Sequence, residues 1–275
     1  MVKKVRVLVG LIGALVVLLT FAGYASATPS PGFHEIDGEV FDDWQVCRTR
    51  AYDEDGYYQI TEASFRPAIA FESLGENADL ACSRGEQLAR KYPDRHQRAE
   101  AIFHFVRDRV DYTSDRDQFG YDEFAQNADE LAAKINGKGV GCGDCEDSAV
   151  LLAVMYKGAG FRSAIAVSSG HTATLVYLPD YKKAAAVFEL EGEPGWVWAE
   201  ATGRNNPLGW VPKEFIGAGL AAYEVTAEAI EQQGPAVPSA AIARTGGAAP
   251  SPPFPFIGVV GFLWLLSLFR RRRAH

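Results

Sequence analysis

The chain has 275 residues, of which 48% are hydrophobic, and its formal net charge is −8. This length suits one catalytic domain with appendages rather than two full domains, and the apolar fraction is ample for a buried core. Because basic residues gather at both ends of the chain, the middle is more acidic still, which disfavours nucleic acid as a partner.

The first segment, residues 1–27, has the composition of a secretory signal peptide. Basic residues precede an apolar run over 7–22, and small residues at 25–27 form a cleavage signal. An uncleaved membrane anchor is the alternative, but the apolar run is short for a membrane span. We favour cleavage. Residues 28–75 then read as a loop-rich lead-in with a strand or two.

Helical patterns follow the lead-in. A helix is predicted over 77–92, and Asp94 with Gln97 has the spacing of a capping box for the next one. That second helix carries an apolar face at helical period, formed by Ala99, Ile102, Phe103, Val106 and Val110. Asn127 with Glu130 marks the start of a shorter helix that runs to Ile135.

An acidic loop is predicted over 111–123, between the second helix and the shorter one. Its carboxylates are dense enough to hold calcium, but their spacing does not fit an EF-hand. A solvated acidic loop is the favoured interpretation, and no metal or cofactor is expected. The acids are Asp111, Asp115, Asp117, Asp122 and Glu123.

The stretch 141–149, Gly-Cys-Gly-Asp-Cys-Glu-Asp-Ser-Ala, joins a glycine-rich loop to a continuous apolar run. This pattern predicts a short buried helix whose first turn carries Cys145 and which ends at glycine. The unpaired N–H groups and the positive dipole end of a helix start favour a thiolate. Cys145 is therefore a candidate nucleophile with a lowered pKa.

The other cysteines leave alternatives open. Cys142 and Cys145 form a C-x-x-C, which also occurs in redox dithiols and zinc sites. A second pair of zinc ligands is absent from the sequence, and loop residues rather than a strand precede the motif. Cys47 and Cys82 are the natural pair if a disulfide forms.

The pattern after Gly160 changes to the period of strands. Strands are predicted over 161–168, 171–178, 184–190 and 196–201, with a short fifth over 210–212. Short turns between consecutive strands predict an antiparallel sheet, so the fold class is α+β. His171 begins one strand and Glu200 ends another. If those strands are close, Glu200 orients His171, which serves as the base for Cys145.

Three short blocks resemble the prokaryotic transglutaminase-like superfamily: Gly-Asp-Cys-Glu-Asp at 143–147, Gly-His at 170–171 and Trp-Ala-Glu-Ala-Thr at 198–202. The resemblance extends from about Ile102 to about Phe215. It implies a papain-like core in which the nucleophile opens a helix packed on an antiparallel sheet. It also implies the catalytic roles of nucleophile for Cys145, base for His171 and orienting acid for Glu200.

The resulting expectation is thiol acyl chemistry on amide bonds of a protein or peptide substrate. Peptidase or amidase hydrolysis is favoured over transfer to an amine such as lysine. The backbone N–H of Cys145 is the expected oxyanion donor, with Gln118 and Tyr112 as side-chain candidates. The alternatives are a surface binding module with a vestigial triad and a C-x-x-C thiol oxidoreductase.

The carboxyl end predicts a membrane anchor. A segment rich in proline, alanine and glycine precedes an apolar run over 254–269 and an arginine cluster, which should remain cytoplasmic. This tail resembles surface-protein sorting signals, whose cleavage stays open. The catalytic domain is then extracytoplasmic at the cell surface, on a single-pass membrane protein. We divide the chain into a signal peptide 1–27, lead-in 28–75, transglutaminase-like domain 76–230, linker 231–253, transmembrane helix 254–270 and basic tail 271–275.

Overall fold

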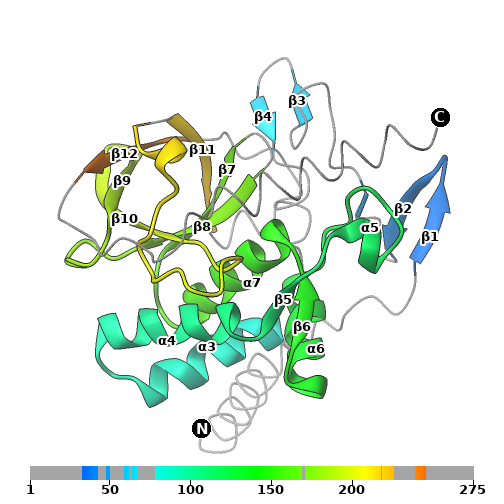
Figure 1. The fold of residues 1–275 in the computed structure, drawn as a ribbon, viewed down its shortest axis with the longest axis horizontal. Coiled ribbons are helices and arrows are strands. Elements are labelled where there is room, and N and C mark those ends of the chain that lie inside the picture. Colours follow the sequence, from blue (N-terminus) through cyan, green and yellow to red (C-terminus); the bar gives the residue numbers. More distant parts are fainter. Residues whose placement is uncertain are drawn as a thin grey trace, which may run out of the picture.

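The computed structural model describes residues 33–42, 48–49, 59–61, 64–66, 78–168, 171–217, 219–225 and 239–245. Within these residues a group of helices packs against a curled antiparallel sheet (Figure 1). The α+β arrangement that the order of the elements predicts is confirmed.

The helices precede the sheet in the chain. They are α3 (Asp79–Lys91), α4 (Arg95–Arg107), the single turn α5 (Asp115–Gln118), α6 (Ala128–Lys138) and α7 (Cys145–Gly158). All except α5 lie where helices are predicted. Asp94 caps α4 by accepting a hydrogen bond from the Gln97 N–H at 2.8 Å. Asn127 and Glu130 form the predicted capping box of α6.

The start of α3 is capped by another helix. Asp129, in the first turn of α6, accepts hydrogen bonds from the backbone N–H groups of Leu80 at 2.9 Å and Ala81 at 2.8 Å. These are two of the N–H groups that a helix start leaves without an intrahelical partner. The carboxylate also complements the positive end of the α3 dipole. A single buried side chain therefore fixes α3 against α6.

The sheet consists of β7 (Ser163–Ser168), β8 (His171–Tyr177), β9 (Ala186–Leu190), β10 (Glu193–Ala199), β11 (Gly219–Glu224) and β12 (Ser239–Thr245). The strands are antiparallel and close into a barrel in the order β10-β8-β7-β11-β12-β9. The first four strands lie where strands are predicted. β11 and β12 are additional and complete the barrel between β7 and β9. Since β12 falls within 231–253, this part of the predicted linker is a strand.

The fifth strand predicted over 210–212 is wrong. These residues form no strand, and the chain there makes turns instead. The Trp210 N–H donates to the Pro207 carbonyl at 3.1 Å. Pro212 has no N–H for a ladder, and it stands directly before the 3-10 turn η1 (Lys213–Phe215).

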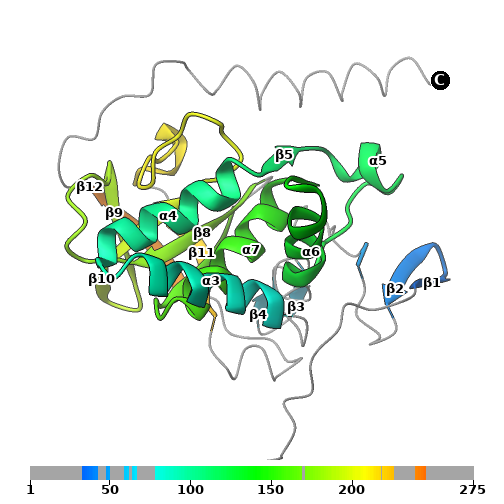
Figure 2. The same ribbon diagram turned by 90° about the horizontal axis from the view of Figure 1, so that it is seen from below.

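Helix α7 lies at the centre of the molecule. It is buried on every side from Cys145 to Tyr156. The barrel covers one side of it, and α3, α4 and α6 cover the other, as Figures 1 and 2 show. The Thr174 hydroxyl of β8 donates to the Ala149 carbonyl of α7 at 2.7 Å. This all-round burial explains why the sequence of α7 is apolar without a polar face.

The contact between α3 and α7 depends on two glycines. A Cβ added at Gly85 of α3 would lie 2.0 Å from the Met155 carbonyl oxygen of α7. A Cβ added at Gly158 of α7 would lie 2.2 Å from the Cys82 carbonyl oxygen of α3. Backbone therefore meets backbone at this crossing, and no side chain larger than hydrogen fits between the helices.

The described parts of the lead-in contain two hairpins, and their four short strands are more than the one or two predicted. β1 (Phe33–Ile36) pairs with β2 (Glu39–Asp42), and β3 (Gln59–Thr61) pairs with β4 (Ser64–Arg66). Arg48 connects this region to the start of α6. Its Nη1 donates to the Ala125 carbonyl at 2.9 Å and to Glu130 at 3.1 Å, and its side chain is buried.

Several predicted features lie outside the described residues. They are the signal peptide 1–27, the transmembrane helix 254–270 and the basic tail 271–275. Among the helices that the structure does describe, none is both long enough and apolar enough to cross a membrane. Cys47 also lies outside, whereas its suggested partner Cys82 is a free thiol that contacts the Val154 carbonyl of α7.

Candidate active site

The loop before α7 holds Cys145 in place through a short parallel ladder. β5 (Val110–Tyr112) pairs in parallel with β6 (Gly141–Gly143), and Cys145 begins α7 two residues later. A Cβ at Gly143 would lie 2.7 Å from a carboxylate oxygen of Asp147. Glycine is therefore required here because the first turn of α7 folds back against the loop.

A buried network braces this turn. The Asp147 carboxylate accepts from the backbone N–H of Gln126 at 2.8 Å and from its side-chain amide at 2.5 Å. It also accepts from the Asp144 N–H at 3.2 Å, while the Gln126 amide donates to the Cys142 carbonyl at 2.9 Å. Lys134 of α6 donates to the Gln126 side chain. The chain on both sides of Cys145 is thus fixed by one carboxylate.

The structure brings His171 and Glu200 together. His171 begins β8, and Glu200 follows the last residue of β10, the neighbouring strand. The His171 Nε2 atom contacts the Glu200 carboxylate, and both side chains are largely buried. Thr202 donates its backbone N–H to the other Glu200 oxygen at 3.0 Å, and its hydroxyl donates to the same atom. Glu200 is therefore held from one side while it holds His171 on the other.

Aromatic rings enclose the histidine. The Phe215 ring stacks on His171 with centroids 5.7 Å apart and planes 6° apart. The Trp198 ring lies at 6.2 Å and 25°. Sequence reasoning missed the role of Phe215, which the turn η1 brings against the imidazole. These rings reduce the freedom of the imidazole and shield its pair with Glu200 from water.

Mutual attraction sets the protonation of this pair. Burial alone lowers the pKa of His171, but the charge and hydrogen bond of Glu200 outweigh burial and raise it. Burial alone raises the pKa of Glu200, but His171 and Thr202 outweigh burial and lower it. The arrangement favours an imidazolium beside a carboxylate, as expected for an orienting acid.

We expect Glu200→Gln to destabilise the protein by about 3–5 kcal/mol near pH 5.5, because it breaks a buried ion pair. The lowered pKa of Glu200 means that its contribution is present above its ordinary 4.5 and is lost as the pH falls. The raised pKa of His171 means that its contribution is full below its ordinary 6.5 and is lost as the pH rises through the folded value. The loss of stability in Glu200→Gln should therefore be largest between pH 4.5 and pH 6.5.

Urea unfolding of the wild type and Glu200→Gln at acidic and alkaline pH measures this difference. Asp180→Asn, which changes an exposed carboxylate beyond β8, is the control and should show no such pH dependence. A stability difference for Glu200→Gln that stays constant from pH 5.5 to pH 9 would refute the ion-pair interpretation.

The Cys145 thiol lies beside the first residues of β8. Its sulfur receives a hydrogen bond from the backbone N–H of Thr172, the residue next to His171. The thiol donates to the Glu146 carboxylate, with the sulfur 3.2 Å from Oε2. The Cys145 thiol therefore lies close to the start of β8, the strand whose first residue, His171, contacts Glu200.

The predicted lowering of the Cys145 pKa is wrong for this structure. Burial raises the pKa of Cys145 well above its ordinary value, and the Glu146 and Asp144 carboxylates raise it further. The Thr172 N–H acts in the opposite direction but is weaker. The helix start does supply a favourable dipole, but desolvation and the two carboxylates that flank the cysteine in sequence outweigh it.

Two further residues were considered as oxyanion donors. The pKa of Tyr112 is raised first by burial of its phenol and then by the charge of Cys145, although 49% of the residue as a whole is exposed. The Gln118 side chain has a buried amide whose nitrogen and oxygen lack hydrogen-bond partners within the described part of the chain. Cys142, by contrast, is exposed in the middle of β6, while Cys145 is buried.

The acidic loop is only partly solvated, contrary to expectation. Asp111, Asp117 and Asp122 are exposed, but Asp115 and Glu123 are 2% and 6% exposed. The sequence indicated this loop only by the density of its acidic residues. That density does not distinguish Asp115 and Glu123 from the exposed acids, because their burial depends on how the loop packs against the start of α7.

Comparison with known families identifies one match. Residues 83–215 match the model of the transglutaminase-like superfamily. This span includes Cys145, His171 and Glu200 and ends at Phe215. A search of curated proteins found no match.

Proposed function

Because residues 83–215 form a domain of the transglutaminase-like superfamily, we propose that this chain is a papain-like cysteine enzyme that performs thiol acyl transfer on amide bonds. The proposal rests on the buried contact between His171 and Glu200. His171 is followed by Thr172, whose backbone N–H hydrogen-bonds the Cys145 sulfur. In this proposal Cys145 is the nucleophile, His171 the base and Glu200 the orienting acid, and each comes from a different element.

In the proposed mechanism, the Cys145 sulfur attacks the carbonyl carbon of an amide. Because Nε2 of His171 is held by Glu200, Nδ1 of the neutral ring, which forms as the pH rises through the raised pKa of His171, takes the thiol proton and later gives it to the departing amine. Glu200 stabilises the imidazolium that forms between these steps. Water then attacks the acyl-enzyme and releases the acid product.

The tetrahedral intermediate needs donors for its negative oxygen. The backbone N–H of Cys145 belongs to the first turn of α7, where N–H groups lack intrahelical partners. Tyr112 is a candidate second donor because its phenol and Cys145 influence each other electrostatically. Gln118 is another, because its buried amide has no hydrogen-bond partner among the described residues. Each donor of this kind typically contributes about 10²–10³-fold to the rate.

Hydrolysis is the favoured outcome over transfer to a second amine. The test incubates the full chain with a glutamine-containing peptide, with and without a labelled primary amine. Release of ammonia or peptide cleavage without label incorporation supports hydrolysis, whereas incorporation identifies a transferase. A chain that does neither, across peptide and glutamine substrates, would favour a surface binding module with a vestigial triad.

The rival C-x-x-C oxidoreductase is less well supported. Both thiols are free, and the first is exposed on β6 while the second is buried at the start of α7. Thr172, whose backbone N–H acts on the buried thiol, follows His171 in the chain, and His171 contacts Glu200. A nucleophile needs a histidine with an acid partner, and a redox pair does not. A reversible Cys142–Cys145 disulfide that controls reduction of a partner dithiol would support the redox function instead.

The proposed location is the outer side of the cell membrane. Support comes from the sequence of the two ends, where a signal-like segment precedes the domain and an apolar segment with arginines follows it. The substrate would then be an extracellular protein or peptide. Protease added to intact cells should digest the domain, and protection until the cells are lysed would contradict this location.

A further inference from the structure

Arg48 is a buried arginine that lies outside the residues of the family match. It belongs to the lead-in, whereas the match begins at residue 83. Its side chain is 1% exposed. Arginine stays charged at any ordinary pH, and a buried charge is costly unless it is paired. The groups that Arg48 contacts therefore indicate what this residue does.

Arg48 holds residues 125–130, here called the bracing segment, at both ends. At one end, the Arg48 carbonyl accepts from the Ala125 N–H at 2.9 Å, and Nη1 donates to the Ala125 carbonyl at 2.9 Å. At the other end, Nη1 donates to the Glu130 carboxylate at 3.1 Å. The same Glu130 oxygen accepts from the Asn127 N–H at 2.6 Å, so the two ends of the segment are also joined to each other.

Gln126 is the second residue of the bracing segment and connects it to the loop before α7. Its backbone N–H donates to Asp147 at 2.8 Å, and its side-chain amide donates to the same carboxylate at 2.5 Å. The amide also donates to the Cys142 carbonyl at 2.9 Å. The hydrogen bonds of Gln126 therefore depend on where the bracing segment lies.

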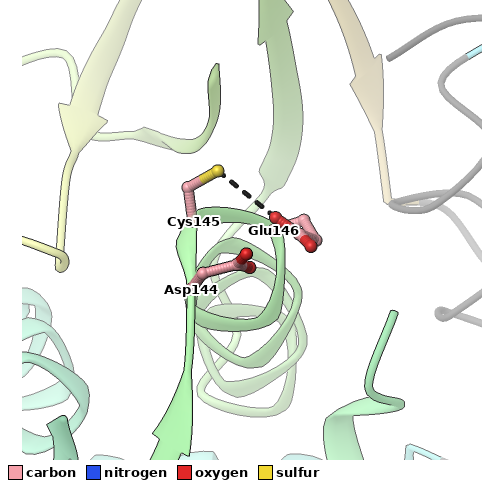
Figure 3. Close-up of side chains that lie close together, drawn as sticks. All are labelled: Asp144, Cys145 and Glu146. Atoms are coloured by element: carbon pink, nitrogen blue, oxygen red, sulfur yellow. Dashed lines mark hydrogen bonds between the residues drawn. The ribbon is translucent and has the colours of Figure 1, made fainter. Parts of the chain in front are cut away.

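Asp147 connects this network to the nucleophile. It accepts from the Asp144 N–H at 3.2 Å. Asp144 stands directly before Cys145 at the start of α7 (Figure 3). Hydrogen bonds and the peptide bond before Gln126 thus join Arg48 to the residue that precedes Cys145.

We propose that Arg48 is a positioning residue that holds the loop carrying Cys145, so that the lead-in is part of the catalytic unit. Arg48 acts through Gln126 and not on the substrate. A buried ion pair adds little net stability over an apolar contact, but its directional bonds specify one arrangement of the groups that they join. The inference rests on the proposed function, because that function makes Cys145 the nucleophile.

The lead-in also makes an apolar contact beside the bracing segment. The ring of Phe33 in β1 lies edge-on to Phe124, with centroids 5.7 Å apart. Figures 1 and 2 show the β1–β2 hairpin on the side of the molecule where α5 lies. Because Phe33 is 50% exposed and a ring contact has no directional bond, this contact covers the segment without fixing its position. Among these two contacts, only that of Arg48 fixes the segment.

The first test compares Arg48→Met with the wild type in the full chain. Methionine fills a similar space but donates no hydrogen bond. We expect kcat for a peptide amide to fall by about 10–100-fold with KM within about twofold, because a small displacement of a catalytic group lowers the rate to this extent. Arg48→Lys keeps the charge and can still donate to Glu130, so its kcat should be at least about threefold above that of Arg48→Met.

Arg116→Met is the matched control for this comparison. Arg116 forms an ion pair with Asp122 in the acidic loop, and its side chain is 67% exposed. Because an exposed ion pair contributes little, kcat should remain within about twofold of the wild type. Should Arg48→Met fail to fold, the same measurements on Arg48→Lys decide, because lysine retains a buried charge beside Glu130.

Amide hydrogen exchange supplies a measurement that needs no activity. In Arg48→Met the N–H groups of Gln126 and Asp144, which donate to Asp147, should exchange at least about tenfold faster than in the wild type. The N–H of Leu151, in the buried middle of α7, should change by less than about twofold. If the wild type hydrolyses no amide, the proposed function fails, yet this exchange pattern still decides whether Arg48 holds the loop.

A double-variant cycle tests the route through Gln126. Gln126→Ala removes the amide that donates to Asp147 and to the Cys142 carbonyl. If Arg48 acts through Gln126, adding Arg48→Met to Gln126→Ala should lower kcat little further.

Three results would overturn the proposal. The first is that kcat and the exchange of Gln126 in Arg48→Met both stay within about twofold of the wild type. The second is exchange that accelerates equally at Leu151 and Gln126, which would make Arg48 a general structural residue. The third is a double variant whose loss of kcat equals the product of the two single losses.

Discussion

Cys145→Ala is expected to reduce amide hydrolysis by about 10³-fold or more, because no other group at the site can form the acyl-enzyme. His171→Ala should cause a comparable loss, and the double variant should be little worse than either, since the two residues act as one unit. The measurement is the rate of product release from a peptide amide under single-turnover conditions. Residual activity would reflect the oxyanion donors and binding alone.

Cys142→Ala is the matched control for this prediction. Cys142 is exposed in β6 and contributes its backbone carbonyl, not its thiol, to the network around Asp147. The variant should retain activity within about threefold of the wild type, as is usual for an exposed side chain away from the reaction. Equal loss in Cys142→Ala and Cys145→Ala would replace the nucleophile mechanism by dithiol chemistry. Full activity in Cys145→Ala would refute the proposed function.

Gly85→Ala is expected to destabilise the protein by about 3 kcal/mol, which is large for the addition of one methyl group. The new Cβ would lie 2.0 Å from the Met155 carbonyl oxygen, and backbone cannot turn aside as a flexible side chain can. Gly158→Ala should have a similar effect from the opposite helix, where the nearest atom is the Cys82 carbonyl oxygen at 2.2 Å. Equilibrium unfolding in urea measures both changes.

Gly137→Ala supplies the control within the same group of helices. Gly137 lies in α6, and an added Cβ meets no atom within 4 Å. Alanine is the better helix former by about 1 kcal/mol, so this variant should be as stable as the wild type or slightly more stable. If Gly85→Ala and Gly137→Ala have the same small effect, α3 and α7 do not cross as closely as the structure shows.

The helices were predictable because each carries a local signal. Asp94 and Asn127 have side chains that accept from the backbone two or three residues later, and that preference does not depend on the rest of the fold. Helix α7 follows from its apolar run and its glycine-rich boundary. The strands β7 to β10 follow from a change of period and short turns. Closure by β11 and β12 could not be predicted, because it depends on pairing across the sheet.

The candidate site was partly predictable for the same reason. Cys145, His171 and Glu200 were selected because each lies at the boundary of a predicted element, where a side chain is held but remains reachable. The contact between His171 and Glu200 follows once β8 and β10 are neighbours. Phe215 was missed because a turn of the chain, rather than a periodic pattern, places its ring on His171.

Electrostatics marks the limit of what sequence alone determined. The sequence established the helix start at Cys145, the order of helices before strands and the acids at 115, 123, 144 and 146. Only the tertiary structure decided that those acids are buried together, and that burial, followed by the charges of Glu146 and Asp144, raises the pKa of Cys145 against the helix dipole. The physical reason is that helix caps and strand periods act over a few residues, whereas desolvation depends on every segment that packs around a group.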